Sequence, residues 1–318
     1  MPQYRNALPQ LSGDVFLTDA GVETDLIFNH GIEIREFAAH TLLPTPQGRE
    51  ALTRYFEGFL DLARDTNTGF ILDSVTWKAH AHWAASLGAD TAELRAANDD
   101  SIRFIADLRA RHSANAKPIV LNAVIGPRGD AYRPEGTIAM EAAEEYFFEQ
   151  LGWLAATDAD MVTALTFNQA GEAAGLARAA RTVGMPAVVS FTVETNGALP
   201  TGQSLAEAIA QVDEATNSSP AYYMINCAHP DHFAGVLADA PWARRIRGVR
   251  ANASRRSHAE LNDSPTLDSG DPRELAGQYR ELAERMPWLN VFGGCCGSDL
   301  RHLTEIARAL PGPRRATA

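Results

Sequence analysis

The chain has 318 residues, of which 45% are hydrophobic, enough for one large domain or two ordinary ones. Its formal net charge of −12, without any basic cluster, argues against binding nucleic acid or an anionic membrane surface. Three cysteines are too few for a disulfide scaffold and, being odd in number, predict reduced thiols. Since no segment resembles a signal peptide or a membrane span, we expect a cytoplasmic protein.

Eight short apolar runs recur along the whole chain and predict strands. Each run is rich in β-branched or aromatic residues, and the longer ones do not alternate strictly with polar residues. This pattern is typical of parallel strands that are buried on both faces. The predicted strands cover residues 15–18, 70–73, 119–124, 161–165, 187–192, 222–225, 248–251 and 290–292.

Helical patterns lie between these strands. Apolar residues recur at helical spacing over 52–63, 140–154 and 300–310, which predicts amphipathic helices there. Ser298 or Asp299 can cap the last of these helices at its N-terminus. The polar stretch 252–272 is expected to form a long loop.

The alternation of eight strands with helices predicts a (β/α)8 TIM barrel. An open doubly wound sheet is the alternative fold. No linker or internal repeat divides the chain, so we expect one domain over residues 1–312. The remaining residues, 313–318, are predicted to be a disordered tail.

All three cysteines directly follow predicted strands. Cys227 follows the sixth strand, whereas Cys295 and Cys296 follow the eighth, within the sequence GGCCG. The carboxyl ends of the strands carry the active site of a TIM barrel, so the three sulfurs are expected to meet there. The alternative is that these are three unrelated buried cysteines, because free cysteine is often buried.

Three converging thiolates suggest Zn²⁺, since a catalytic zinc keeps three protein ligands and an open fourth position. Gly293, Gly294 and Gly297 allow the chain to bend so that two adjacent side chains can face one ion. A thiolate-rich zinc can hold a substrate thiol as a nucleophilic thiolate, so alkyl transfer to sulfur is the expected reaction. A zinc lyase or hydrolase that uses the open position for water is the alternative enzyme.

The chain resembles the homocysteine S-methyltransferase family over about residues 15–310. The resemblance implies a TIM barrel in which Cys227, Cys295 and Cys296 bind zinc, and the zinc holds homocysteine as a thiolate that accepts a methyl group to give methionine. Small molecules, a thiol acceptor and a methyl donor, are therefore the expected partners, and a homo-oligomer is possible. The segments that carry the resemblance are LTDAG at 17–21, DSVTWKA at 73–79, SFTVETNGALPTGQSL at 190–205, INCAHP at 225–230 and GGCCG at 293–297.

Three further residues match the family pattern. Asp19 matches an acidic residue after the first strand, near the polar end of the bound amino acid, although the family's Asp-Gly is Asp-Ala-Gly here. Asn226 fits the family's Asn-Cys pair and could orient the metal site, and Asn252 matches an asparagine after the seventh strand. Ordinary hydrogen bonding within loops is the alternative role for both asparagines.

The fourth strand departs from the family pattern. The family typically ends this strand with Glu-Thr, and the glutamate binds the amino group of homocysteine, whereas this chain has Leu165 and Thr166. Either Asp19, Asn168 or Gln169 takes over the ammonium group, or the acceptor is a different thiol. Thr166 and Asn168 are accordingly predicted to bind substrate.

The methyl donor is expected to be a sulfonium or quaternary ammonium compound, such as S-methylmethionine, S-adenosylmethionine or betaine. Aromatic faces bind such cations, and Trp77 after the second strand is the best-placed candidate, followed by Phe167. His229 is expected at the surface, and the alternative is that it orients the metal site next to Cys227. It is also the only candidate for a fourth ligand if the zinc is merely structural.

Overall fold

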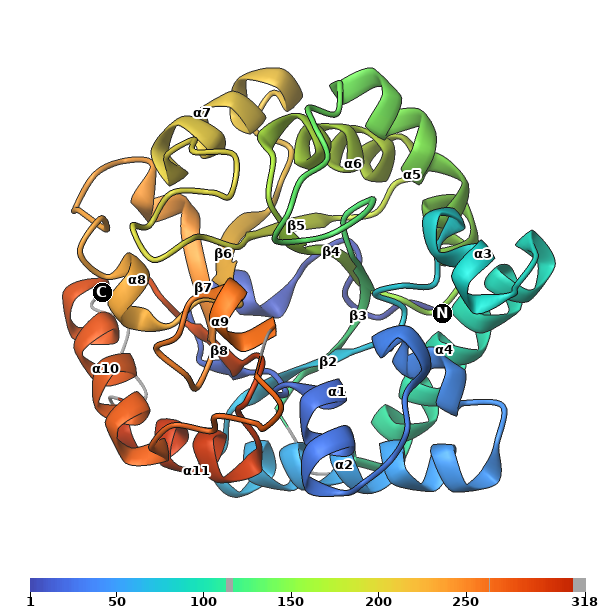
Figure 1. The fold of residues 1–318 in the computed structure, drawn as a ribbon, viewed down its shortest axis with the longest axis horizontal. Coiled ribbons are helices and arrows are strands. Elements are labelled where there is room, and N and C mark those ends of the chain that lie inside the picture. The colour runs from blue at the N-terminus through green and yellow to red at the C-terminus, as the bar shows by residue number, and fades with distance from the viewer. Residues whose placement is uncertain (113–116, 263, 311–318) are drawn as a thin grey trace.

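The computed structural model describes residues 1–112, 117–262 and 264–310, which form a closed barrel of eight parallel strands inside a ring of helices (Figure 1). The strands follow one another around the barrel in chain order, and β1 pairs with β8 to close it. The predicted single-domain TIM barrel is therefore confirmed. The strands are β1 (Phe16–Leu17), β2 (Gly69–Asp73), β3 (Ile119–Ile125), β4 (Met161–Phe167), β5 (Ala187–Phe191), β6 (Tyr222–Asn226), β7 (Ile246–Ala251) and β8 (Val291–Gly294).

Helices cover the outside of the barrel, and the three predicted from apolar spacing are α2, α5 and α11. Asp299 caps α11, since its side chain accepts a hydrogen bond from the Arg301 amide. None of the described helices is long and apolar enough to cross a membrane. The helices are α1 (Val22–Thr24), α2 (Pro46–Asp65), α3 (Ala84–Leu87), α4 (Thr91–His112), α5 (Met140–Ala155), α6 (Ala170–Thr182), α7 (Leu205–Thr216), α8 (Pro230–Phe233), α9 (His258–Asn262), α10 (Pro272–Arg285) and α11 (Leu300–Ala309).

Two segments near the carboxyl end of the chain were predicted to lack regular structure. The stretch 252–272, expected to be a loop throughout, contains the short helix α9. The predicted tail at 313–318 lies outside the described residues.

Successive side chains along each strand point alternately into the barrel and toward the helices. In β4, Met161 and Leu165 face the barrel interior, whereas Val162 and Ala164 belong to the core between strands and helices. Because both faces are buried, the strand reads as a nearly continuous apolar run.

The barrel interior divides into two layers. The lower layer, near the amino ends of the strands, is a separate apolar cluster formed by Leu8, Phe16, Ile71, Val120, Met161, Val188, Tyr222, Met224 and Val291. The polar layer above it consists of Asp73, Asn122, Thr163, Ser190, Asn226 and Arg250, all buried and hydrogen-bonded. The polar layer lies directly beneath the cysteines that follow β6 and β8.

Candidate metal centre and substrate cavity

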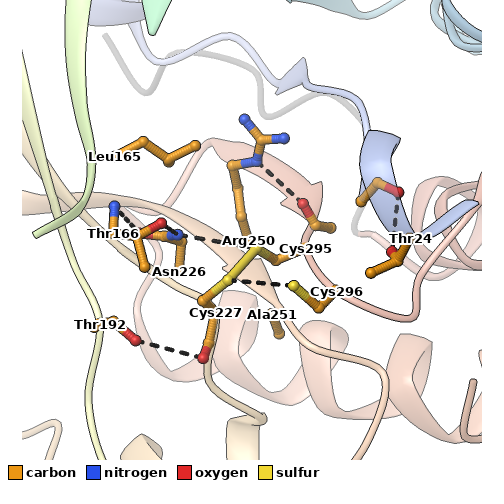
Figure 2. The surroundings of a disulfide bond; sticks show 12 residues. Thr24, Leu165, Thr166, Thr192, Asn226, Cys227, Arg250, Ala251, Cys295 and Cys296 are labelled. Atoms are coloured by element: carbon orange, nitrogen blue, oxygen red, sulfur yellow. Dashed lines mark hydrogen bonds between the residues drawn. A yellow bond between two sulfur atoms is a disulfide. The ribbon is translucent and has the colours of Figure 1, made fainter. Parts of the chain in front are cut away.

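The three cysteines converge at the carboxyl ends of the strands, as Figure 2 shows. Their Sγ atoms all lie within 4.8 Å of one another, and the Sγ atoms of Cys227 and Cys296 are 3.7 Å apart. Cys227 and Cys295 are paired as a disulfide, whereas Cys296 is free. The expectation of three reduced thiols therefore does not hold in this structure, and metal binding by all three requires reduction of this pair.

Strand β7 explains why cysteines after β6 and β8 meet. It lies between these two strands, and its carbonyls accept hydrogen bonds from both cysteine segments: Cys227 N donates to Arg250 O at 3.1 Å, and Cys295 N to Ala251 O at 2.9 Å. Cys227 adopts a φ of 54°, an uncommon backbone conformation for a non-glycine residue and one that marks functional sites.

The glycines of the GGCCG segment permit the tight approach of this turn to its neighbours. A Cβ atom at Gly293 would overlap Thr18 Oγ1, and one at Gly294 would overlap Ser298 Oγ. Gly297 has a φ of +78°, which a side chain rarely tolerates. The segment therefore needs glycine at all three positions for steric reasons.

Asn226 fixes the end of β4 against the metal centre. Its Oδ1 accepts hydrogen bonds from Thr166 N and Ser190 Oγ, at 3.0 and 2.6 Å, and its Nδ2 donates to Thr166 Oγ1 at 2.8 Å. The same Nδ2 lies 3.9 Å from Cys295 Sγ. Asn226 therefore lies beside the sulfurs and is hydrogen-bonded to Thr166, while its predicted role in orienting the site stays a prediction.

Arg250 crosses the barrel beside the sulfurs and binds two carboxylates. Its guanidinium donates to Asp19 Oδ1 at 2.5 Å, to Asp73 Oδ2 and to the Gly294 carbonyl. Burial alone would lower the pKa of Arg250, but Asp19 and Asp73 outweigh burial and raise it. Burial raises the pKa of Asp19 to about 7 despite the opposing charge of Arg250. Asp19, predicted to bind substrate, therefore already has a cationic partner.

A cavity of about 320 Å³ opens over the three sulfurs. Its walls include Trp77 and Leu165, and the Trp77 indole donates a hydrogen bond to the Leu165 carbonyl at 2.9 Å. Tyr132 also lines the cavity, and its hydroxyl donates to Cys227 Sγ at 3.2 Å. The ammonium of Lys78 lies 3.8 Å from the ring centroid of Trp83 and 5.7 Å from that of Trp77.

Four residues singled out from the sequence lie away from the cavity wall. Asn168 and Gln169 hold the loop between β3 and α5, through bonds to the carbonyls of Asp130 and Ala131 and to the backbone of Gly136 and Ile138. Asn252 is buried, and its main-chain N–H donates a hydrogen bond to Ala228 O. Phe167 packs against Phe147 of α5, because the positive φ of Thr166 and the irregular pairing with β5 interrupt the alternation along β4 and turn Phe167 outward.

The prediction of a surface position for His229 is wrong. Its side chain is buried, and its Nδ1 accepts a hydrogen bond from the Asp231 amide at the start of α8. Burial lowers its pKa to about 4. Among the described residues, the three cysteines form the one group able to hold a metal ion, and His229 is not part of it.

The structure also adds four residues that the sequence did not single out: Glu23, Lys78, Tyr132 and Arg250. Arg250 follows the inward period of β7, so an ionised side chain inside a predicted strand was a usable signal. Glu23 lies in the three-residue helix α1, and Lys78 and Tyr132 lie on the β2–α3 and β3–α5 loops, whose path no local pattern fixes.

The fold and the sulfur cluster together define a TIM barrel with three cysteines gathered at the carboxyl ends of its strands. The chain matches the family described as homocysteine S-methyltransferase over residues 16–310, and it therefore belongs to this family of methyltransferases. No curated protein sequence matches the chain.

Solved structures of the homocysteine methyltransferase MmuM from Escherichia coli share the fold. The oxidized form aligns with a TM-score of 0.74 and 17% identity, covering 95% of this chain and 98% of that chain. The metallated form aligns with a TM-score of 0.72 and 18% identity, covering 95% and 99%. At this identity, the likeness extends to the fold alone.

Proposed function

We propose that the protein transfers a methyl group from a sulfonium or quaternary ammonium donor to a thiol held as a thiolate on Zn²⁺, with homocysteine as the acceptor and methionine as the product. The observation that carries the proposal is the convergence of three cysteine sulfurs at the floor of a cavity. The family membership sets aside the lyase and hydrolase alternatives.

The cysteine geometry fits zinc. Two thiolates bound to one tetrahedral Zn²⁺ at about 2.3 Å lie roughly 3.8 Å apart. Cys227 Sγ and Cys296 Sγ are separated by 3.7 Å, and Cys295 lies beside both. Thiolates are also the soft ligands that zinc accepts readily. We place the protein in the cytoplasm because a reducing compartment keeps the Cys227–Cys295 pair open for the metal.

Bound zinc would supply a site at which the substrate thiol loses its proton near neutral pH. The protein supplies orientation. Asn226 ties the end of β4 to the sulfurs, and the Tyr132 hydroxyl donates to Cys227 Sγ, which stabilises negative charge on that sulfur. The partly buried walls around Trp77 and Leu165 shield the thiolate from water and leave the cavity as the approach path for the donor.

Reduced, zinc-loaded protein should methylate homocysteine with at least one donor from a panel that contains S-methylmethionine, S-adenosylmethionine and betaine, with products measured by mass spectrometry. Cys296→Ala should lower zinc affinity by more than about 100-fold and abolish turnover, because even residues that only orient ligands contribute about 10- to 100-fold. Ser219→Ala, a similarly small change far from the cavity, should retain both the zinc affinity and the turnover of the wild type. Full zinc content and activity in Cys296→Ala would disprove the proposed site.

A further inference from the structure

The charges in the cavity wall are unbalanced toward the negative side. Four carboxylates line it, against the two cations Lys78 and Arg250; the four are Asp19, Glu23, Asp73 and Asp130. Three carboxylates have partners: Asp19 and Asp73 share Arg250, and Asp130 accepts from the amides of Tyr132 and Arg133. Such an excess of negative potential favours a cationic ligand.

Glu23 is the carboxylate left without such a partner. No ion pair within 4.0 Å reaches it from any described residue, Lys78 included, although Lys78 lines the same cavity. The Lys78 ammonium is engaged elsewhere, because it donates to the Glu36 carbonyl at 2.7 Å and lies over the Trp83 ring. Glu23 is partly buried, and burial raises its pKa to about 7.

The position of Glu23 is fixed by the metal centre itself. Glu23 lies in α1 next to Thr24, whose Oγ1 accepts a hydrogen bond from Gly297 N at 3.1 Å. On the other side, Gly21 N donates to Ser298 O at 3.3 Å, and a Cβ atom at Gly21 would overlap the Cys295 carbonyl. Figure 2 shows Thr24 beside the cysteine turn. The segment that carries Glu23 is therefore fixed against the cysteine turn on both sides of the glutamate, by one side-chain and one main-chain hydrogen bond.

Glu23 shares the cavity wall with the three cysteines and with the other carboxylates. A carboxylate placed among other negative groups is unfavourable unless a positive group binds near it. A ligand that brings its own cation to Glu23 would relieve this repulsion.

We infer that Glu23 binds the ammonium group of the thiol acceptor, so that the acceptor is an aminothiol whose sulfur lies at Cys227, Cys295 and Cys296 while its amino group lies at α1. The inference rests on the proposed function. A primary ammonium offers three N–H donors to a carboxylate, whereas a sulfonium centre or a quaternary nitrogen offers none. The residues first expected to hold this group are engaged, Asp19 by Arg250 and both Asn168 and Gln169 by the β3–α5 loop.

The test compares two thiols that differ only in the amino group, homocysteine and 4-mercaptobutanoate. Glu23→Gln should lower kcat/KM for homocysteine by about 10- to 100-fold, the effect of one charged hydrogen bond, and leave that for 4-mercaptobutanoate unchanged. Glu23→Asp, which keeps the carboxylate, should retain part of the preference for homocysteine over 4-mercaptobutanoate. Asp25→Asn removes a charge two residues away, outside the cavity wall, and should behave like the wild type.

Three outcomes would overturn the inference: equal losses for both thiols, no loss for either, or a rise in KM for the methyl donor alone. Equal zinc content and circular dichroism spectra ensure that a loss is not a folding defect. If the wild-type enzyme methylates no thiol at all, the proposed function fails. Calorimetric binding of the two thiols to the zinc-loaded protein then still decides on Glu23, because tighter binding of homocysteine that disappears in Glu23→Gln supports its role.

Discussion

The lower layer and the polar layer of the barrel interior occupy successive positions on the same strands, yet they differ completely in chemistry. In β2, Ile71 belongs to the apolar lower layer, and two residues later Asp73 binds Arg250 and Asn122. Apolar side chains fill space without constraining direction, whereas each polar group must find a partner in a defined geometry. The lower layer therefore stabilises the barrel, and the polar layer positions the groups above it.

The largest effect is expected from Arg250→Met. Removal of the guanidinium leaves Asp19 and Asp73 buried without a cation, so the free energy of unfolding should fall by about 3–5 kcal/mol at pH 8. The loss should be smaller at pH 5, because unpaired carboxylates are then protonated. Denaturant unfolding at pH 8 and at pH 5 measures the loss in the free energy of unfolding at each pH. Arg247→Met, on the same strand, should change stability by only about 0.5 kcal/mol because Arg247 is only half-buried and donates a single long hydrogen bond, at 3.5 Å, to Leu11 O. A loss comparable to that of Arg250→Met would contradict this account.

In the lower layer, Ile71→Ala should destabilise the protein by about 2–5 kcal/mol through lost apolar contacts and a cavity. The kcat/KM of the folded protein should be unchanged, since Ile71 belongs to the lower layer and does not line the cavity. Ile71→Val should have a smaller effect of about 0.5–1.5 kcal/mol. A loss of activity in fully folded Ile71→Ala would show that the two layers are not independent.

Glu172 is a buried carboxylate outside the barrel, and no cation among the described residues approaches it within 4.0 Å. Burial raises the pKa of Glu172 to about 7, opposed by a hydrogen bond from the Arg128 amide and by the Arg128 charge. Between pH 4.5 and 7 the unfolded chain loses this proton while the folded protein keeps it, so stability falls as the pH rises through that window. Glu172→Gln should remove up to about 3 kcal/mol of this decline. If the free energy of unfolding of the wild type and of Glu172→Gln changed in parallel between pH 4.5 and 7, the prediction would be wrong.

The smallest effect is expected from Leu165→Glu, which places a second carboxylate in the cavity wall. Leu165 lines the same cavity as Glu23, so this change should improve the use of homocysteine by a few-fold. In the Glu23→Gln background it should restore part of the lost kcat/KM, while 4-mercaptobutanoate should not benefit. No change with homocysteine in either background would refute the assignment of this position to the amino group. Leu165→Gln, of similar size but uncharged, is the control.

Much of the fold could be predicted because parallel strands buried on both faces leave a strong local signal. All eight predicted strands are present, and most boundaries differ by only one or two residues. The end of β4 was placed at residue 165 instead of Phe167, since Thr166 and Phe167 continue the strand through the irregular pairing with β5. The helix α9 was missed because five residues are too short for a periodic pattern.

The site was predicted unevenly for a physical reason. Cysteines at strand ends must meet once the barrel closes, so their convergence followed from topology. The orientation of loop side chains does not follow from topology. Asn168 and Gln169 immediately follow β4, as a binding residue would, yet their amides hold the β3–α5 loop. Glu23 lies in a segment whose approach to the cysteine turn depends on contacts with Gly297 and Ser298.

The sequence by itself determined the barrel, the family and the convergence of the three cysteines, because hydrophobic periodicity and strand ends are local features whose consequences are fixed by chain closure. Only the tertiary structure decided which charges remain free. Arg250, Asp19 and Asp73 come from three strands or strand ends far apart in the chain, and their mutual neutralisation is visible only when the barrel brings them together. Pairing across space leaves Glu23 as the carboxylate available to a ligand.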